Sequence, residues 1–364
     1  MERSNLTQPL VRGTCFALFA YDVAPYIDLA VCEERILTAK HRQTVRKRRG
    51  LEYFEYRPTP LRVTEQTSTV SVAGHESRGS VDLVFYDFGA VTVSFAIPFR
   101  CSFSELIAFG DELYDDENLS AAARQSLERV LGLLDGSGFK VADVVEDYIV
   151  FQIEDLEPHL SPAELLTKHG NEIAQLLRAE TEPLSEQETA DALLGRIAFG
   201  SSDLTLIDWN AAVLIGEDIE DILTVIEFAN VQLLEMRYLD RQLDEALEES
   251  YALVSRVPRN RRSALRFHHH DVERVARLQV DGAILFERVT NALKVFGEEY
   301  MGRVYTLTAR RLRLSDWDTS AMRKLATLDT IYSKLTDRAA TQRLEFLEWI
   351  IVFLIALSIV LSFI

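Results

Sequence analysis

The stretch V-D-L-V-F-Y-D-F-G-A-V-T-V-S-F-A-I, residues 81–97, decides the fold of the first half of the chain. Residues 81–87 and 90–97 are rich in β-branched and aromatic side chains, which favour β-strands. Phe88-Gly89 lies between them, and glycine tolerates the backbone conformations that tight turns need. The stretch therefore predicts an antiparallel β-hairpin that turns near Gly89.

The rest of the first half is predicted to combine strands and helices. Strand composition recurs in residues 13–21, 51–56, 61–72 and 143–153, and helical periodicity predicts helices over residues 27–47, 102–113 and 118–134. We therefore expect an α+β head domain over residues 1–155, with a mixed and largely antiparallel sheet. Residues 156–216 are expected to extend this domain with short helices and a small β segment.

The character of the sequence changes after Gly216. Residues 217–255 contain no glycine or proline, and apolar residues recur there at three-and-four spacing, which predicts a long helix. A second helix is predicted from residue 271 and a third from residue 315. Along the third, alternating steps of four and three mark a heptad seam of Ala321, Leu325, Leu328, Tyr332, Leu335, Ala339, Gln342 and Phe346. Residues 217–346 are therefore predicted to form a long antiparallel helical stalk with coiled-coil character.

The sequence ends on W-I-I-V-F-L-I-A-L-S-I-V-L-S-F-I, residues 349–364, without a charged residue, glycine or proline. A helix that is apolar on every side needs apolar surroundings, so residues 347–364 are predicted to form one C-terminal transmembrane helix. Sixteen helical residues rise roughly 24 Å, less than the roughly 30 Å of a hydrocarbon core, and a buried or oligomer-forming helix is the alternative. The anchoring residues are expected to be Trp349, Ile350, Ile351, Phe353, Leu354, Leu357, Ile359, Leu361 and Phe363.

Composition restricts the classes of partner. The chain has 364 residues, of which 57 are acidic and 39 are basic, so its formal net charge is −18. This balance argues against broad, unspecific binding to nucleic acids. The three cysteines show no C-x-x-C spacing, which predicts neither a disulfide framework nor a thiolate zinc site. The first 21 residues have the pattern of neither a secretory signal nor a transit peptide.

A cluster of arginines lies in the predicted connection between the first and second long helices. In an antiparallel stalk this connection lies at the membrane end, where each arginine contributes on the order of 1 kcal/mol against anionic lipid. The possible headgroup contacts are Arg256, Arg259, Arg261, Arg262 and Arg266, and a solvated surface is the alternative. The three histidines that follow diverge by about 100° each on a helix and predict no metal site.

A second basic run is a candidate RNA contact. Arg42 and Arg46 share a helix face, as do Arg46 and Arg49, and such a stripe can bind phosphates. The candidate residues are Lys40, Arg42, Arg46, Lys47 and Arg49. The alternative for this run is again a solvated helix face.

The sequence lacks the usual signals of an enzyme. No G-x-x-x-x-G-K-[ST], G-x-G-x-x-G, G-x-S-x-G or H-E-x-x-H motif occurs. Pairs of carboxylates, such as Asp82 with Asp87 or Asp208 with Glu217, fit turn and cap roles better than acid–base chemistry. We therefore predict no catalytic residue, no cofactor and no metal.

Several segments together resemble the family named for requirement in meiotic nuclear division, which includes the yeast Sad-interacting factors. They are the turn around Asp87 and Gly89 in F-Y-D-F-G-A-V, residues 85–91, the helical segments 227–240 and 291–294, and L-E-W-I-I, residues 347–351. The resemblance implies a membrane-tethered assembly or adaptor role, and it carries over no catalytic residues. Mitochondrial members of that family support translation, but this chain lacks a presequence, so a bacterial or other non-mitochondrial location is expected.

The predicted function is therefore a tail-anchored, non-enzymatic scaffold or adaptor in a bacterial inner membrane or its equivalent. Lipid would bind the C-terminal helix, and the helical stalk would bind a second copy or a helical protein partner. The alternatives are a membrane-tethered factor that binds RNA or the ribosome, and an enzyme whose site lies in the head domain.

Overall fold

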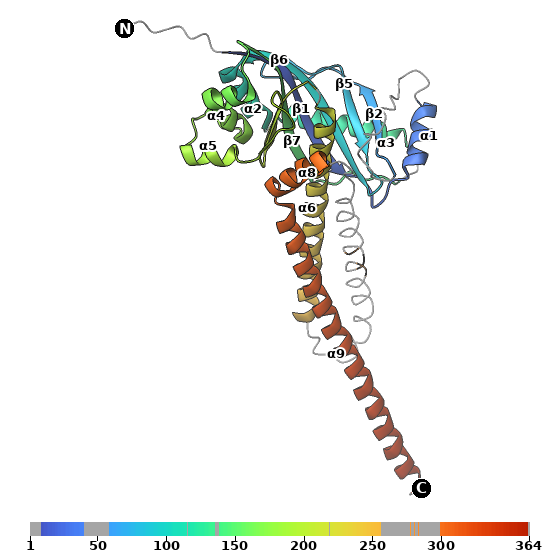
Figure 1. Cartoon of the computed structure of the whole chain (residues 1–364). Helices are drawn as coiled ribbons and strands as arrows, with labels where there is room; N and C mark the ends of the chain where they lie inside the picture. Colours follow the sequence, from blue (N-terminus) through green and yellow to red (C-terminus); the bar gives the residue numbers. More distant parts are fainter. Residues whose placement is uncertain are drawn as a thin grey trace. The chain divides into compact units, whose positions relative to one another are not determined.

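The structure is a computed structural model that divides the chain into two compact units (Figure 1). The first comprises Met1–Glu235 and Val289–Ser315, and the second comprises Met236–Arg288 and Asp316–Ile364. The residues that it describes are 9–39, 58–114, 116–134, 138–217, 219–255, 277, 280, 283 and 299–362. The predicted strand over residues 51–56 lies outside them.

The first unit is an α+β fold built on a mixed sheet of eight strands, in the order β2-β5-β6-β1-β7-β10-β9-β8. The long central strand β1, Leu10–Asp22, pairs antiparallel with both β6, Ala90–Ser102, and β7, Val145–Glu157. Among the described strands only β10, Ala211–Ile215, pairs parallel, with β7. The remaining strands are β2 Leu61–Gln66, β5 Ser80–Phe85, β8 Arg196–Ile197 and β9 Leu204–Ile207, and β3 Ser71–Val72 pairs separately with β4 His75–Glu76.

The predicted hairpin at Gly89 is confirmed, because β5 and β6 pair antiparallel on either side of it. Gly89 has φ +111°, and a Cβ there would overlap the carbonyl oxygen of Ala24. The turn also holds the end of β1: Val23 N donates to Gly89 O at 2.9 Å, and Ile27 N donates to Asp87 O at 2.8 Å. The turn therefore positions the backbone between β1 and the helix that follows.

One face of the sheet is covered by helices that bury an apolar core. These are α2 Phe103–Tyr114, α3 Glu117–Gly132, α4 Pro162–Arg178 and α5 Glu186–Ala192, while α1 Leu29–Ala39 also joins this core. Side chains alternate between faces along a strand, so Cys15, Ala17 and Phe19 of β1 point into this core. Local sequence fixes the helix starts, since Asp116 caps α3 and Ser161 forms a capping box with Glu164 ahead of α4.

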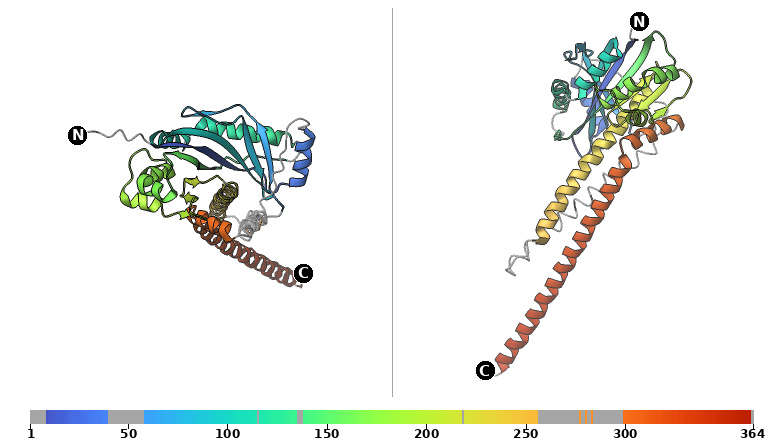
Figure 2. Two further views of the ribbon diagram at one scale, coloured as in Figure 1. Left: turned by 45° about the horizontal axis from the view of Figure 1, so that its top comes forward. Right: turned by 90° about the vertical axis from the view of Figure 1, so that its left-hand side faces the viewer.

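The opposite face of the sheet lies under the N-terminal part of α6, Glu220–Ser255 (Figure 2). The rings of Phe228 and Tyr86 lie 5.9 Å apart, and Asn230 Nδ2 donates to Glu146 O. The short helix α8, Glu299–Arg311, contacts the same helix where Tyr305 OH donates to Gln232 Oε1. The apolar spacing from residue 222 to residue 233 thus reflects packing within the first unit.

The described helices of the second unit are the C-terminal part of α6 and most of α9, Leu314–Ser362. The two helices run parallel with a constant offset of 80 residues. Arg237 stacks on Trp317, Asp240 accepts from Ser320, and Asp244 pairs with Lys324. Leu239, Leu243, Ala246, Ala321 and Leu328 form the buried cluster between them.

The prediction of one long antiparallel stalk over residues 217–346 is wrong. The first part of α6, as far as Glu235, belongs to the unit that contains the sheet, so residues 217–346 do not form one stalk. Apolar spacing along a helix shows that one face is buried, but a sheet and another helix satisfy the same pattern. The spacing of residues 217–236 could not tell these two surfaces apart.

The predicted transmembrane anchor is also wrong. Within the described part of the chain, no helix is both long enough and apolar enough to span a membrane. The physical reason lies in the length of the run: sixteen uncharged residues fall short of the roughly 20 that a span needs, and Arg343, Glu345 and Glu348 precede it. The predictions of a tail-anchored membrane protein and of a bacterial inner-membrane location are corrected on the same ground.

Candidate functional site

Both basic runs of the sequence lie outside the described residues. These are the candidate RNA contacts Lys40, Arg42, Arg46, Lys47 and Arg49, and the candidate headgroup contacts Arg256, Arg259, Arg261, Arg262 and Arg266. The RNA contact therefore stays a prediction. The headgroup contact was derived from the position of a membrane anchor, so its premise falls with that anchor.

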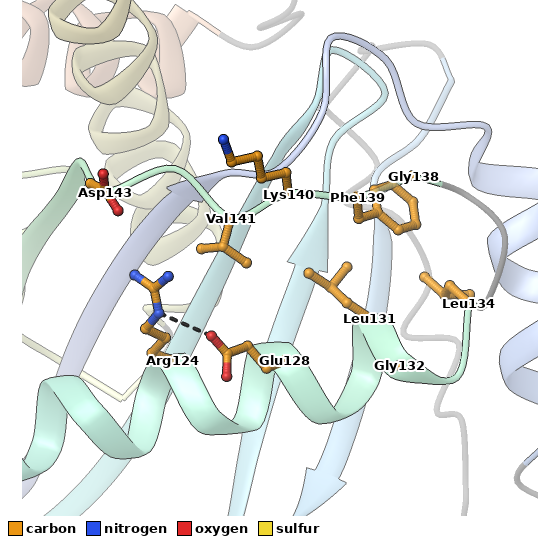
Figure 3. Close-up of a pocket in the computed structure, with 10 residues that line it drawn as sticks. All are labelled: Arg124, Glu128, Leu131, Gly132, Leu134, Gly138, Phe139, Lys140, Val141 and Asp143. Atoms are coloured by element: carbon orange, nitrogen blue, oxygen red, sulfur yellow. Dashed lines mark hydrogen bonds and ion pairs between the residues drawn. The ribbon is translucent and has the colours of Figure 1, made fainter.

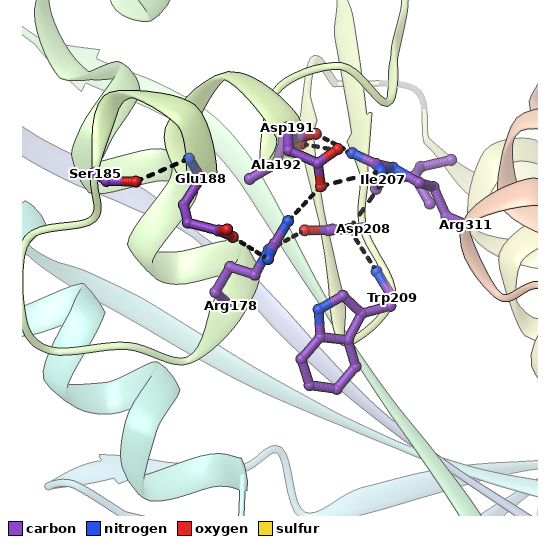
Figure 4. Close-up of polar contacts among 9 residues, drawn as sticks. All are labelled: Arg178, Ser185, Glu188, Asp191, Ala192, Ile207, Asp208, Trp209 and Arg311. Atoms are coloured by element: carbon purple, nitrogen blue, oxygen red, sulfur yellow. Dashed lines mark hydrogen bonds and ion pairs between the residues drawn. The ribbon is translucent and has the colours of Figure 1, made fainter.

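Sequence reasoning missed a cluster of charged groups around Arg178 and Asp208 (Figure 4). Arg178 uses all three guanidinium nitrogens: Nε donates to Asp208 Oδ2 at 2.6 Å, Nη1 to Glu188 at 2.8 Å and Nη2 to Asp191 at 2.6 Å. Arg311, at the end of α8, lies 3.6 Å from Asp208 Oδ1 and donates to the carbonyl oxygens of Asp191 and Ile207. The cluster ties together α4, α5, the turn after β9 and α8.

Asp208 is almost fully buried at the centre of this cluster. Burial raises its pKa, and the two arginines and the Trp209 N–H oppose that rise. Its oxygens accept from Arg178 and Trp209, and Tyr148 OH donates to its backbone carbonyl at 2.8 Å. Because groups of the protein already bind its carboxylate and carbonyl oxygens, a structural role suits Asp208 better than a role in substrate chemistry.

A hollow of about 580 Å³ lies between α3 and the segment that follows it (Figure 3). Leu131 and Phe139 line it together with Arg124, whose Nε donates to Glu128 at 3.0 Å. Both charged side chains are about half exposed, and the Lys140 ammonium points away from Arg124 in Figure 3. The described lining includes no histidine, cysteine, serine or threonine, and of its two carboxylates Glu128 is paired with Arg124 while Asp143 is exposed.

A buried ion pair holds α6 against the edge of the sheet. Arg62 of β2 donates from Nη2 to Glu227 Oε2 at 3.3 Å and lies 3.7 Å from Asp82. Burial raises the pKa of Glu227, and the positive charge of Arg62 opposes the rise. The sequence signal for this pair was a glutamate next to the apolar stripe of α6, which contains Ile226 and Ala229.

Among the described residues, no group of three or more histidine, cysteine, aspartate and glutamate side chains is arranged to hold a metal ion. The three cysteines, Cys15, Cys32 and Cys101, are free thiols in the core, and burial raises the pKa of each of them. A raised pKa leaves a thiol in its unreactive protonated form near neutral pH. None of the three therefore has the character of a catalytic nucleophile.

The most unusual surface is the exposed apolar segment of α9, residues 344–357. Ten large apolar side chains described there have between 38% and 66% of their area exposed: Leu344, Leu347, Trp349, Ile350, Ile351, Val352, Phe353, Leu354, Ile355 and Leu357. Monomeric proteins rarely expose a contiguous apolar surface of this kind, and such surfaces mark sites of interaction. This segment is the candidate functional site.

A family model described as "Uncharacterized protein MJ0711, N-terminal domain" matches residues 12–221. The chain belongs to this family. Its members include the uncharacterized protein MJ0711 of Methanocaldococcus jannaschii, which is 21% identical to this chain over 323 residues; the match covers 87% of this chain and 90% of that protein. No solved structure matches the chain.

Membership in the MJ0711 family corrects the resemblance to the meiotic nuclear division family. The segments that suggested the resemblance were short, and their residue types are common in hairpins and long helices. The F-Y-D-F-G-A-V segment forms the turn between β5 and β6, where a glycine with positive φ is required whatever the family. The Asp87–Gly89 turn is therefore explained by the geometry of the hairpin.

Proposed function

We propose that this protein is a non-enzymatic scaffold or adaptor, which binds other protein chains through the exposed apolar segment of α9. The observation that carries the proposal is the exposure of ten large apolar side chains between residues 344 and 357. Covering half of the exposed area of each side chain would contribute on the order of 10 kcal/mol in total, before the cost of association is subtracted. This segment thus has a strong driving force to bind an apolar partner.

The helix pair of the second unit leaves this segment uncovered. Extending the offset of 80 residues seen at Asp240 and Asp244, the end of α6 at Ser255 corresponds to residue 335 of α9. Helix α9 continues to Ser362, and those remaining residues rise roughly 40 Å at 1.5 Å each. The described part of α6 is therefore too short to bury the segment.

The polar clusters of the first unit support a non-enzymatic role. Arg178, Asp208 and Arg311 satisfy one another, and the hollow beside α3 is lined by half-exposed charges and apolar side chains. A catalytic site is expected to combine a pocket with polar groups that await a substrate. In the first place the polar groups bind one another, and in the second the charged side chains are half-exposed or exposed to solvent.

The test compares the size of the particles that contain the full-length chain in native extracts of cells that make it. Gel filtration should place the wild-type chain well above its own mass of 41.4 kDa. Phe353→Glu should shift it toward the monomer, because a charge in the apolar segment opposes burial. Thr341→Glu, on an exposed polar position of the same helix, should leave the size unchanged.

Two results contradict this proposal. One is elution of the wild-type chain as a monomer in the native extract. The other is an equal loss of size in Phe353→Glu and Thr341→Glu, which would indicate a general disturbance of α9.

A further inference from the structure

We infer that the partner of the exposed apolar segment is the same chain, in a bundle of three or more copies. This inference rests on the proposed function and names the occupant of its binding surface.

The segment has two apolar faces that point in opposite directions. Trp349, Phe353 and Ala356 follow one another at steps of four and three and share one side of the helix. Leu347, Ile351 and Leu354 do the same, centred about 180° away at 100° per residue. A single partner helix covers one side only, so a dimer would leave the second face in water.

The first face continues a surface that already packs against a parallel helix. Ala321 and Leu328 of α9 are fully buried against α6, and the same alternation of four and three leads from them to Trp349 and Phe353. Helix α6 ends at Ser255, so it does not accompany this side of α9 as far as Trp349 and Phe353. The α9 helix of a second copy offers the same kind of apolar surface that α6 supplies to Ala321 and Leu328.

The charge pattern of the segment favours association with another copy of the same chain. A different protein is usually selected through charged residues beside the apolar seam. No charged residue occurs from Trp349 to the end of α9 at Ser362, so nothing there distinguishes a foreign helix from a copy of this one. The requirement is only that the partner be equally apolar, and this chain meets it.

The surface area of the segment also favours a bundle of three or more copies over a dimer. A helix about 10 Å across and 21 Å long, the size of fourteen residues, has a lateral surface of roughly 660 Å². One dimer contact covers less than half of that, well below the roughly 800 Å² that each partner buries in a typical stable interface. Contacts on both faces, as in a bundle of three or more helices, approach the typical value.

The test is sedimentation velocity of the purified full-length chain in detergent-free buffer. The expected result is a discrete assembly of at least three copies. Phe353→Glu and Ile351→Glu should each reduce the assembly, because they lie on opposite faces and both faces are needed, whereas Thr341→Glu should sediment like the wild-type chain.

A monomer, a dimer, or dependence on only one of the two faces would overturn the inference. So would recovery of the chain as a monomer on lipid vesicles after flotation, because lipid would then be the occupant. If the purified chain is a monomer while the particle in native extract is large and sensitive to Phe353→Glu, a foreign partner occupies the segment and the proposed function stands.

Discussion

At the scale of single residues, Gly89 is the position where the backbone allows least variation. Its φ of +111° lies in a region that side chains disfavour, and the carbonyl oxygen of Ala24 occupies the place of a Cβ. The two hydrogen bonds that join the turn to Val23 and Ile27 depend on this close approach. A substitution here affects both the hairpin and the end of β1.

Gly89→Ala should lower the free energy of unfolding by about 3 kcal/mol or more, the sum of backbone strain and the displacement of residues 23–27. Urea denaturation measures the change. Gly79→Ala is the matched control, since the nearest atom to its Cβ is Thr67 O at 3.7 Å, an ordinary contact. Equal stability of the two variants would contradict the assignment of the turn.

Asp22, at the end of β1, should give the protein a characteristic pH dependence. Burial raises its pKa to about 7, above the value of about 3.9 expected in the unfolded chain. Between these values the folded state binds a proton that the unfolded state does not, so stability falls as pH rises from about 4 to about 7. The decline should be smaller in Asp22→Asn and unchanged in Asp143→Asn, as measured by urea midpoints across this range.

At the scale of elements, the pair Arg62–Glu227 fixes the N-terminal part of α6 on the sheet. Glu227 is nearly fully buried, and its charge is balanced by Arg62, which is about one quarter exposed. A buried charge that loses its partner is costly, while replacing both partners by apolar groups is often neutral. The pair is therefore best tested by breaking it from one side and then from both.

Arg62→Met should destabilise the protein by about 3–5 kcal/mol, because Glu227 stays buried without its partner. The double variant Arg62→Met with Glu227→Leu should recover most of the loss. Arg124→Met breaks the half-exposed pair with Glu128 and should cost below about 1 kcal/mol. Thermal and urea unfolding measure the stability of the three variants. An equal loss of stability in all three would contradict the role of the Arg62–Glu227 pair.

At the scale of the whole molecule, the net charge of −18 opposes the association of copies. The apolar segment of α9 supplies the attraction, and the charge supplies a repulsion that salt weakens. A bundle held together by charged contacts would respond to salt in the opposite sense. Ionic strength thus separates the two kinds of assembly.

Raising NaCl from about 0.1 M to about 1 M shortens the screening length from roughly 10 Å to 3 Å. The assembly should therefore become tighter as salt rises, and it should loosen on cooling because hydrophobic association weakens at low temperature. Sedimentation equilibrium over this range measures both effects. Dissociation at high salt would show that charged contacts hold the copies together.

Local signals determined much of the first unit. The composition on either side of Gly89 was enough to predict β5 and β6, and helical periodicity predicted α2 and α3, since hairpins and amphipathic helices depend on neighbours in the chain. The same local reading failed where a partner decides the outcome. Arg178, Asp208 and Arg311 are 30 and 103 residues apart in successive steps, and no spacing rule brings them together.

By itself, the sequence determined where the chain is apolar, where it turns and how strongly it is charged. Tertiary structure decided what each apolar face meets: the first turns of α6 meet a sheet, the later ones meet a parallel α9, and residues 344–357 of α9 stay exposed among the described residues. The reason is that burial of apolar area is non-directional, so an apolar stripe predicts that a helix face is buried but does not predict which surface buries it.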